Sequence, residues 1–475
     1  MRGATRALGD VVRAQQRLAG LLQRSQASLA ARHVTQPELP PFAHEPVQYT
    51  GPSKQEVIDL RKRYLNPAIL AWYKDPVMIT EGNMQYLYDE TGRRYLDVFA
   101  GIVTVSVGHC HPKVVAAVDR QNHLLQHTTN IYLNNEIAEY AKELTSTLPE
   151  SLNVAYFVNS GSEANDMAIL LARLCSGNHD LIALRNCYHG ISEGLLGVLG
   201  HSTWKYNVPS SGGVKHALNP DPYRGRFGND GPAYAEDVRD LIQTATSGQV
   251  AGFISETIQG VGGATPLADG YLAEAYKHVR AAGGVCIADE VQTGFGRTGT
   301  KFWGFENQGV VPDIVTMAKG IGNGLPLAAV VTTDEIAKTM SRRLHFNTFG
   351  GNPVCSAGGR AVLRAIEEDG LQANSLEVGG YIKKGLLALK DKHSIIGDVR
   401  GQGLMLGVEL VKDRDTKAPA KEETVQAFER MKDMGLLIGK GGLLGNVFRI
   451  KPPMCINQQD ADFMLEVMDI ALSEL

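Results

Sequence analysis

The sequence predicts an α/β fold in which helices cover both faces of a mainly parallel sheet. The first observation is a set of short, uninterrupted apolar runs beyond residue 100, each followed by a turn and a helix-like stretch. Strands without polar alternation are typical of parallel sheets, which are buried on both faces. The second observation is the length of 475 residues, which allows more than one core. The runs lie at residues 154–158, 181–185, 251–255, 284–288 and 313–318.

Residues 1–37 differ in composition from the rest of the chain. They hold a single acid, Asp10, no lysine, and apolar residues between arginines at roughly helical spacing: Arg2, Arg6, Arg13, Arg17, Arg24 and Arg32. An arginine-rich, acid-poor segment of this kind predicts a mitochondrial transit peptide. A cationic amphipathic arm on the mature protein is the alternative. A proline-rich joint follows at residues 38–42.

The C-terminal part, residues 350–475, continues with alternating helical and strand-like patterns, including GQGLMLGVEL and VFRIKPP. We therefore expect a smaller second domain of α+β type there, after a larger one at residues 101–349.

Bulk composition argues against several classes of protein. The net charge of −4 does not suit a nucleic-acid or membrane-surface binder. No apolar stretch approaches the roughly 18 residues needed to span a bilayer. The six cysteines include no C-x-x-C pair, which predicts a reducing compartment. His109, Cys110 and His111 are consecutive and can hardly all face one ion, so we expect no metal site.

Residues 294–299 (GFGRTG) have the glycine spacing of a dinucleotide-binding loop. Such a loop directly follows a strand and opens a helix, whose N-terminus holds the pyrophosphate. Here the apolar run ends earlier, at Asp289, and the residues that follow the glycines show no helical periodicity. The segment is therefore predicted to be a loop that binds no dinucleotide.

Reactive side chains follow several of the predicted strands. In the turn at residues 159–166 (NSGSEAND), Gly161 permits close approach and Ser162 can donate to an anion at a helix N-terminus. An ordinary N-cap is the alternative there. Asp289 ends a buried run and needs a cationic or donor partner. Lys319 also follows an apolar run, and as a desolvated amine it would react with carbonyls. A lysine that extends to solvent from a strand end is the alternative.

Ligands bind beyond the carboxyl ends of parallel strands, so these groups are expected to share one site. A phosphate-binding turn, an acid for a pyridine nitrogen and a carbonyl-reactive lysine are what pyridoxal 5′-phosphate requires. We therefore predict a pyridoxal-phosphate enzyme.

The chain resembles the class III pyridoxal-phosphate aminotransferases of fold type I across nearly all of residues 45–475. The resemblance implies a large domain with a mainly parallel sheet between helices, and a smaller α+β domain to which residues 38–100 contribute. It rests on the joint order of six segments: GHCHP (108–112), NSGSEAN (159–165), YHG (188–190), ADEVQTGFGRTG (288–299), the segment around Lys319, and FNTFGGNP (346–353).

The resemblance also implies roles around the cofactor. Lys319 would form the internal aldimine and later move the proton between substrate and cofactor. Asp289 would keep the pyridine nitrogen protonated, so that the ring accepts electrons. Gln292 would hydrogen-bond the phenolic oxygen, and Tyr188 would stack on the ring.

Further roles concern the phosphate and the substrate. The phosphate would lie on the amides of Gly161 and Ser162, and Thr348 of the neighbouring subunit would touch it. The resemblance thus implies a homodimer, or a tetramer built from dimers. Arg449 would bind the substrate carboxylate, for which its planar fork is suited; an arginine at a sheet edge is the alternative. Glu256 matches an acid that can pair with this arginine.

Two departures from relatives that act on ornithine or 4-aminobutyrate point to the substrate. Ile191 stands where many of them have arginine, and Thr257 stands where they often have proline. Together with the arginine-rich leader, these departures make the chain most similar to mitochondrial members that transfer the amino group of L-alanine to glyoxylate by a ping-pong mechanism. Transfer from an ω-amino acid (3-aminoisobutyrate, β-alanine or 4-aminobutyrate) to pyruvate or glyoxylate is the alternative. A lyase, mutase or decarboxylase on the same fold, or a non-catalytic protein, are the rival classes.

Overall fold

The computed structural model describes residues 37–69, 71–209 and 212–475. The predicted transit peptide, residues 1–37, lies outside the described residues except for its last position. The described residues beyond Glu38 form one compact unit, Leu39–Leu475. The domain boundaries predicted at residues 101 and 350 stay predictions.

A seven-stranded sheet carries all five predicted apolar runs. Its strand order is β4-β12-β11-β10-β7-β5-β6. The neighbours β11–β10, β10–β7, β7–β5 and β5–β6 are parallel, and β12 runs antiparallel to both β11 and β4. Six strands therefore end at the same edge. The bounds are β4 (Val154–Val158), β5 (Leu181–Leu184), β6 (Val214–Ala217), β7 (Gly252–Glu256), β10 (Val285–Asp289), β11 (Ile314–Met317) and β12 (Ala328–Thr332).

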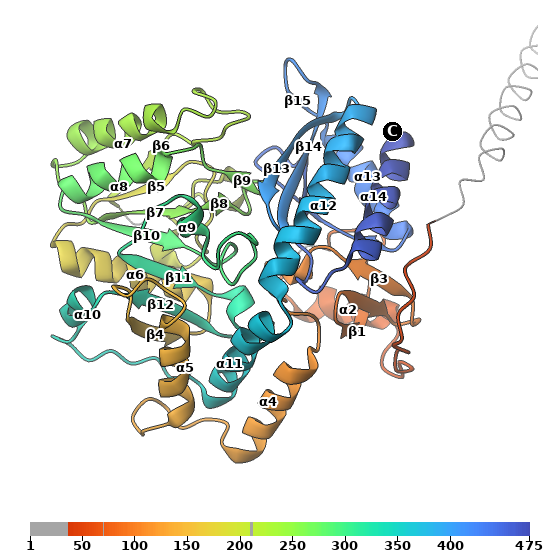
Figure 1. The fold of residues 1–475 in the computed structure, drawn as a ribbon, viewed down its shortest axis with the longest axis horizontal. Coiled ribbons are helices and arrows are strands. Elements are labelled where there is room, and N and C mark those ends of the chain that lie inside the picture. The colour runs from red at the N-terminus through yellow and green to blue at the C-terminus, as the bar shows by residue number, and fades with distance from the viewer. Residues whose placement is uncertain (1–36, 70, 210–211) are drawn as a thin grey trace, which may run out of the picture. The chain divides into compact units, whose positions relative to one another are not determined.

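Helices cover both faces of this sheet (Figure 1). On β10, Asp289 accepts a hydrogen bond from Asn165 of α6 (Gly161–Ser176). Cys286 of the same strand instead contacts the carbonyl of Tyr276 on α8 (Tyr271–Ala281). Side chains an odd number of residues apart on a strand point to opposite faces, so α6 and α8 lie on opposite sides. The predicted α/β fold, with its mainly parallel sheet between helices, is confirmed.

Helix α6 shows how the local sequence fixes the start of a helix beside the site. Ser160 caps it, with its hydroxyl accepting from the amide of Glu163. The helix ends at Gly177, whose φ of 69° lies in the left-handed region that glycine adopts without strain. The N-terminus of α6 therefore lies directly after β4, at the edge where the parallel strands end.

The C-terminal residues build a second sheet, ordered β13-β14-β18-β17, with β15 paired to β14. Helices α12 and α13 pack on this sheet, and α14 packs against both of these helices (Figure 1). The bounds are β13 (Ile396–Gln402), β14 (Met405–Asp413), β15 (Ala418–Pro419), β17 (Gly439–Gly441), β18 (Val447–Ile450), α12 (Leu371–Lys392), α13 (Lys421–Asp433) and α14 (Gln458–Ser473).

A third sheet joins segments far apart in the chain. Strand β16 (Leu436–Leu437) pairs in parallel with β3 (Arg94–Asp97), which continues through β2 (Tyr86–Asp89) to β1 (Ile79–Asn83). The remaining elements are α2 (Lys54–Tyr64), α3 (Ala100–Val103), α4 (Pro112–Leu124), α5 (Asn135–Thr145), α7 (Gly231–Ala245), α9 (Gly304–Asn307), α10 (Asp334–Met340), α11 (Pro353–Glu368), the pair β8 (Ile258–Gln259) and β9 (Thr265–Pro266), and the 3₁₀ turns Glu193–Leu195, Ser202–Trp204 and Lys319–Ile321.

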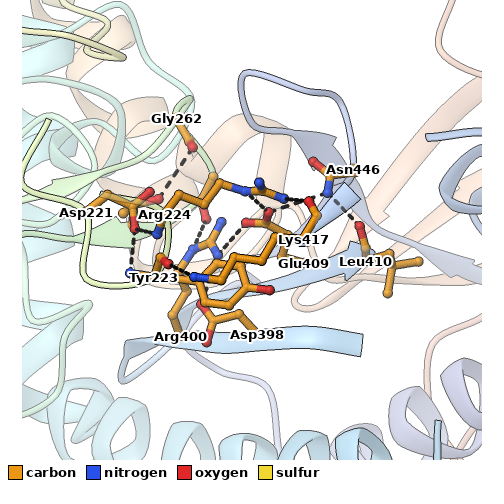
Figure 2. A network of polar contacts seen from close by, with 12 residues as sticks. Asp221, Tyr223, Arg224, Gly262, Asp398, Arg400, Glu409, Leu410, Lys417 and Asn446 are labelled. Atoms are coloured by element: carbon orange, nitrogen blue, oxygen red, sulfur yellow. Dashed lines mark hydrogen bonds and ion pairs between the residues drawn. The ribbon is translucent and has the colours of Figure 1, made fainter. Parts of the chain in front are cut away.

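A polar network ties the loop after β6 to the C-terminal sheet (Figure 2). Glu409 on β14 is buried, and its carboxylate accepts from the guanidinium groups of Arg224 and Arg400. Arg400 also donates to the carbonyl of Gly263 over 3.0 Å. Removing one partner from such a buried group leaves an uncompensated charge and is strongly destabilising. The network therefore holds the sheet that carries β18, and with it Arg449, against the larger sheet.

Candidate active site

Three predicted site residues meet at the carboxyl edge of the seven-stranded sheet. Asp289 ends β10 and lies in register with Glu256, which ends the neighbouring strand β7. Lys319 follows β11, the strand on the other side of β10. Adjacent parallel strands thus bring one amine and two carboxylates together, as the sequence predicts.

Asp289 is buried and held by three donors. Its Oδ2 accepts from Nδ1 of His189 at 2.7 Å and from Nδ2 of Asn165 at 2.9 Å. Its Oδ1 accepts from the amide of Val291 at 3.0 Å. Burial alone would lower the pKa of His189, but Cys187 and Asp289 outweigh this effect and raise it well above its usual value. These three donors fix the orientation of the Asp289 carboxylate.

Lys319 combines backbone strain with an unpaired amine. Its φ is 51°, in the left-handed region that a side chain rarely adopts. Such strain collects at functional sites, where the surrounding structure enforces it. Among the residues that the structure describes, its amine has no hydrogen-bond or ion-pair partner. Burial lowers the pKa of Lys319, although Asp289 and Glu256 oppose this shift. A lowered pKa makes the amine a better nucleophile near neutral pH.

The N-terminus of α6 packs tightly against the segment after β5. The hydroxyl of Ser162 accepts from the amide of Ile191 over 3.4 Å. Gly190 has a φ of 115°, and a Cβ placed there would lie only 2.4 Å from the Ser162 hydroxyl. The first amides of a helix lack partners within the helix and favour an anion. Gly161 and Ser162 therefore offer donors for a phosphate, close to where β10 and β11 end.

Glu256 holds the backbone around Tyr188. Its Oε1 accepts from the amide of Tyr188 at 3.1 Å, and its Oε2 accepts from the amide of Gly260 at 2.7 Å. Burial raises the pKa of Glu256. The Tyr188 ring meets Trp204 edge to face, with centroids 5.3 Å apart. Glu256 thus fixes two segments that face the edge of the sheet.

Arg449 on β18 is 4% exposed and lacks a carboxylate partner among the described residues. It donates to the carbonyls of Lys440 at 3.0 Å and Gly260 at 3.4 Å, and its buried Nε has no acceptor. The expected ion pair with Glu256 is not formed; the oxygens of that acid accept from the backbone amides of Tyr188 and Gly260 instead. Burial lowers the pKa of Arg449 to about 10, so the guanidinium stays charged. It remains available for an incoming carboxylate.

Two further predicted residues differ in their surroundings. Gln292 is buried, and its Oε1 accepts from Nζ of Lys451 at 2.8 Å. Thr348 is exposed on the segment between α10 and α11 and makes no side-chain hydrogen bond to the described residues. Gln292 therefore belongs to the same edge as Asp289. Thr348 itself makes no polar contact there, although the preceding residue, Asn347, accepts from the side chain of Asn159 in the turn before α6 at 3.0 Å.

The glycine-rich segment 294–299 and the histidines at 109 and 111, for which the sequence predicts no dinucleotide or metal role, make structural contacts instead. The glycines at 294–299 form a loop, and the next helix, α9, begins only at Gly304. Arg297 in this loop is buried and donates to the carbonyls of Leu404 and Pro452. The loop packs against the C-terminal part of the chain, which explains its glycines without a dinucleotide. His109 and His111 bind two different carboxylates, Asp97 and Asp369.

Sequence reasoning gave no role to Asn165, His189 and Lys451, which support the predicted residues. Asn165 lies one helical turn after Gly161, on the same face of α6, and that spacing was the available signal. His189 directly follows Tyr188, inside a segment already singled out. Lys451 lies two residues after Arg449, the spacing that places two side chains on one side of an extended chain.

This fold, with a lysine, an acid and a helix N-terminus at the edge of its mainly parallel sheet, is that of the fold type I transferases. The chain belongs to the class III aminotransferase family: the family described as aminotransferase class-III matches residues 70–472. It is therefore an aminotransferase. The family depends on pyridoxal phosphate. No helix among the described residues is long and apolar enough to cross a membrane.

Similar proteins agree with this assignment. A protein of Arabidopsis thaliana named alanine–glyoxylate aminotransferase 2 homolog 2, mitochondrial, is 56% identical over 95% of this chain and 94% of its own length. The human mitochondrial alanine–glyoxylate aminotransferase 2 is 46% identical over 93% of this chain and 90% of its own length.

Among solved structures, a phospholyase from Arthrobacter in complex with phosphoethanolamine has a TM-score of 0.82 and 34% identity, covering 88% of this chain and all of the other. An (S)-enantioselective ω-transaminase from Thermomicrobium roseum has a TM-score of 0.83 and 30% identity, covering 90% of this chain and 99% of the other.

Proposed function

We propose that this aminotransferase moves the amino group of L-alanine to glyoxylate, giving pyruvate and glycine, with pyridoxal 5′-phosphate bound at the carboxyl edge of the large sheet. The observation that carries the substrate assignment is the 56% identity to a relative of that name over 95% of the chain. The same names support a mitochondrial location, which agrees with the arginine-rich leader.

Two features of the sheet edge support binding of pyridoxal phosphate there. The amine of Lys319 has no partner among the described residues, and the first amides of α6 point out of the same edge. When bound, pyridoxal phosphate supplies an aldehyde for the amine and a ring that accepts electrons. Lys319 is the residue that would hold it covalently and carry the proton on Nζ. Asp289 would face the ring nitrogen, since three donors hold its carboxylate in place at this edge.

The remaining residues would bind or orient. The amides of Gly161 and Ser162 would hold the phosphate, Tyr188 would cover one face of the ring, and Gln292 would donate to the phenolic oxygen. Arg449 would bind the substrate carboxylate through its Nε and its planar fork, which suits bidentate binding.

A homodimer is part of this proposal, because Thr348 would contact the phosphate held by the partner subunit. Strongly exposed apolar side chains surround it: Leu344, Phe346 and Phe349 are 104%, 55% and 63% exposed. Patches of this kind are typical of protein interfaces.

A mixture of K319A and T348D subunits tests whether Thr348 acts across the dimer interface. If Thr348 acts across the interface, random mixing restores one site in each heterodimer and about a quarter of wild-type activity. If it acts within its own subunit, no activity returns.

The function is tested by incubating the purified protein with pyridoxal phosphate, L-alanine and glyoxylate. We expect equal amounts of pyruvate and glycine, and none with K319A. A panel of donors containing 3-aminoisobutyrate, β-alanine and 4-aminobutyrate decides the alternative. Phosphoethanolamine is included because a phospholyase shares this fold. Release of phosphate without transfer of the amino group to glyoxylate would replace the proposal by a lyase.

A further inference from the structure

Lys451 is a buried amine next to the site that the proposed chemistry does not use. Its side chain is completely buried at the end of β18. Its Nζ donates to Oε1 of Gln292 at 2.8 Å and to the carbonyl of Gly260 at 3.2 Å. No carboxylate among the described residues pairs with it. Burying an unpaired amine is unfavourable, so a position of this kind calls for an explanation.

The contact with Lys451 determines which way the amide of Gln292 faces. Burial, followed by the neighbouring Arg449, lowers the pKa of Lys451 well below its usual value, but its Nζ carries N–H donors in either protonation state, whereas an amide has one accepting oxygen and one donating nitrogen. The amide oxygen accepts from Nζ of Lys451, and the amide nitrogen therefore points away from it. Among the described residues, Nε2 of Gln292 has no acceptor. The two N–H groups on Nε2 of Gln292 are therefore oriented and can donate to a bound ligand.

The surrounding backbone leaves the amide little freedom. A Cβ on Gly260 would lie 2.3 Å from Oε1 of Gln292 and 2.5 Å from its Nε2, so the side chain packs directly on that glycine. The carbonyl of Gly260 accepts from Lys451 and also from Arg449. The amide of Gly260 is held by Glu256. Lys451, Gln292 and Arg449 therefore all contact Gly260, whose backbone is held in place by Glu256.

We infer that Lys451 is a positioning residue: it holds Gln292 with its amide nitrogen toward the cofactor, where that nitrogen donates to the phenolic oxygen. This inference rests on the proposed function, because it requires pyridoxal phosphate at the sheet edge. Without Lys451, no donor selects the position of Oε1 over that of Nε2 in the Gln292 amide. If the amide rotated by 180°, its oxygen would face the phenolic oxygen of the cofactor and could not donate to it.

A double-mutant cycle on cofactor affinity tests this role without relying on turnover. The dissociation constant of pyridoxal phosphate is measured by absorbance of the bound cofactor in wild type, K451M, Q292L and the double variant. Methionine has a similar length and no donor. We expect K451M to weaken binding about tenfold, the value of one oriented hydrogen bond. In the Q292L background the same change should have no further effect, because Lys451 acts through Gln292.

Lys432 provides the matched control. It is also a buried lysine, on α13, where its amine lies near Glu429 and over the ring of Tyr73. K432M should lower the unfolding temperature of the apoprotein but leave the cofactor dissociation constant within twofold of wild type, in both Gln292 backgrounds.

The outcomes separate the two proposals. If wild type binds no pyridoxal phosphate, the proposed function itself fails. If wild type binds it but K451M weakens binding equally with Gln292 and with Leu at that position, Lys451 has only a structural role and the inference is overturned. The inference is also overturned if Q292L binds the cofactor as tightly as wild type does.

Discussion

Replacing Asp289 by asparagine separates the charge of this side chain from its shape. The carboxylate accepts from three N–H groups, those of His189, Asn165 and Val291. Asparagine offers one accepting oxygen and one donating nitrogen. Whichever way the amide turns, at least one of the three donors faces a group that cannot accept its hydrogen.

The magnitude follows from this count. One buried donor left without an acceptor costs about 1–3 kcal/mol, so D289N should lose about that much free energy of unfolding. The functional loss should be larger, because the neutral amide cannot hold a proton on the ring nitrogen. Removing one fixed electrostatic contact from an active site typically lowers kcat by about 10²–10³-fold. We expect D289N to lose at least that much.

The neighbouring acid gives a matched control. Glu290 is equally buried, but its oxygens accept from the amides of Gly304 and Phe305 and from the hydroxyl of Thr293. E290Q should therefore lower stability while keeping kcat within about threefold of wild type. Pyruvate formation at saturating alanine and glyoxylate, and thermal unfolding of each holoprotein, give both numbers. A kcat for D289N within about tenfold of wild type would refute the assigned role of this carboxylate.

Three further predictions follow from the same site. Burial raises the pKa of Glu290 from 4.5 to about 7, so the stability that this side chain contributes is fully present below its unfolded pKa and is lost as pH rises through about 7. The unfolding free energy of wild type relative to E290Q should therefore fall by about 3 kcal/mol across this window. A difference that stays constant with pH would contradict the prediction. R449L should reduce kcat/KM for L-alanine about 10–10²-fold, the value of a hydrogen bond to a charged group, while an amine donor without a carboxylate should lose no more than about twofold; equal losses for both donors would argue against carboxylate binding. Because burial lowers the pKa of Lys319, the rate at which apoprotein takes up pyridoxal phosphate covalently should reach its plateau below the usual lysine pKa of 10.5, and stopped-flow absorbance that shows no plateau below that value would contradict the assignment.

The strand ends could be predicted because parallel strands leave a simple pattern. An uninterrupted apolar run followed by a charged residue identified Asp289, Glu256 and Lys319, since such a residue can only be tolerated where the strand leaves the core. The antiparallel strand β12 escaped this reasoning, because the direction of a strand depends on how the chain returns to the sheet. Edge strand β6 (VKHA) also escaped it, since its polar residues resemble a loop.

Supporting residues were harder to predict, because their roles depend on contacts between distant parts of the chain. Lys451 meets Gln292 across 159 positions, and Asn165 meets Asp289 across 124. Spacing along the chain places Asn165 near Gly161 and Lys451 near Arg449, but it does not show which distant side chain either residue contacts. Glu256 also has a distant partner that the sequence does not reveal, because one of its oxygens accepts from the amide of Tyr188, 68 positions earlier.

The central claim is that one lysine holds the cofactor. The holoprotein is reduced with borohydride, digested and analysed by mass spectrometry for a peptide carrying the reduced pyridoxyl group. We predict a single modified residue, Lys319, and a K319A protein that retains no label. Labelling of another lysine in its place, such as the buried Lys451, or absence of any label in the yellow wild-type protein, would contradict the account.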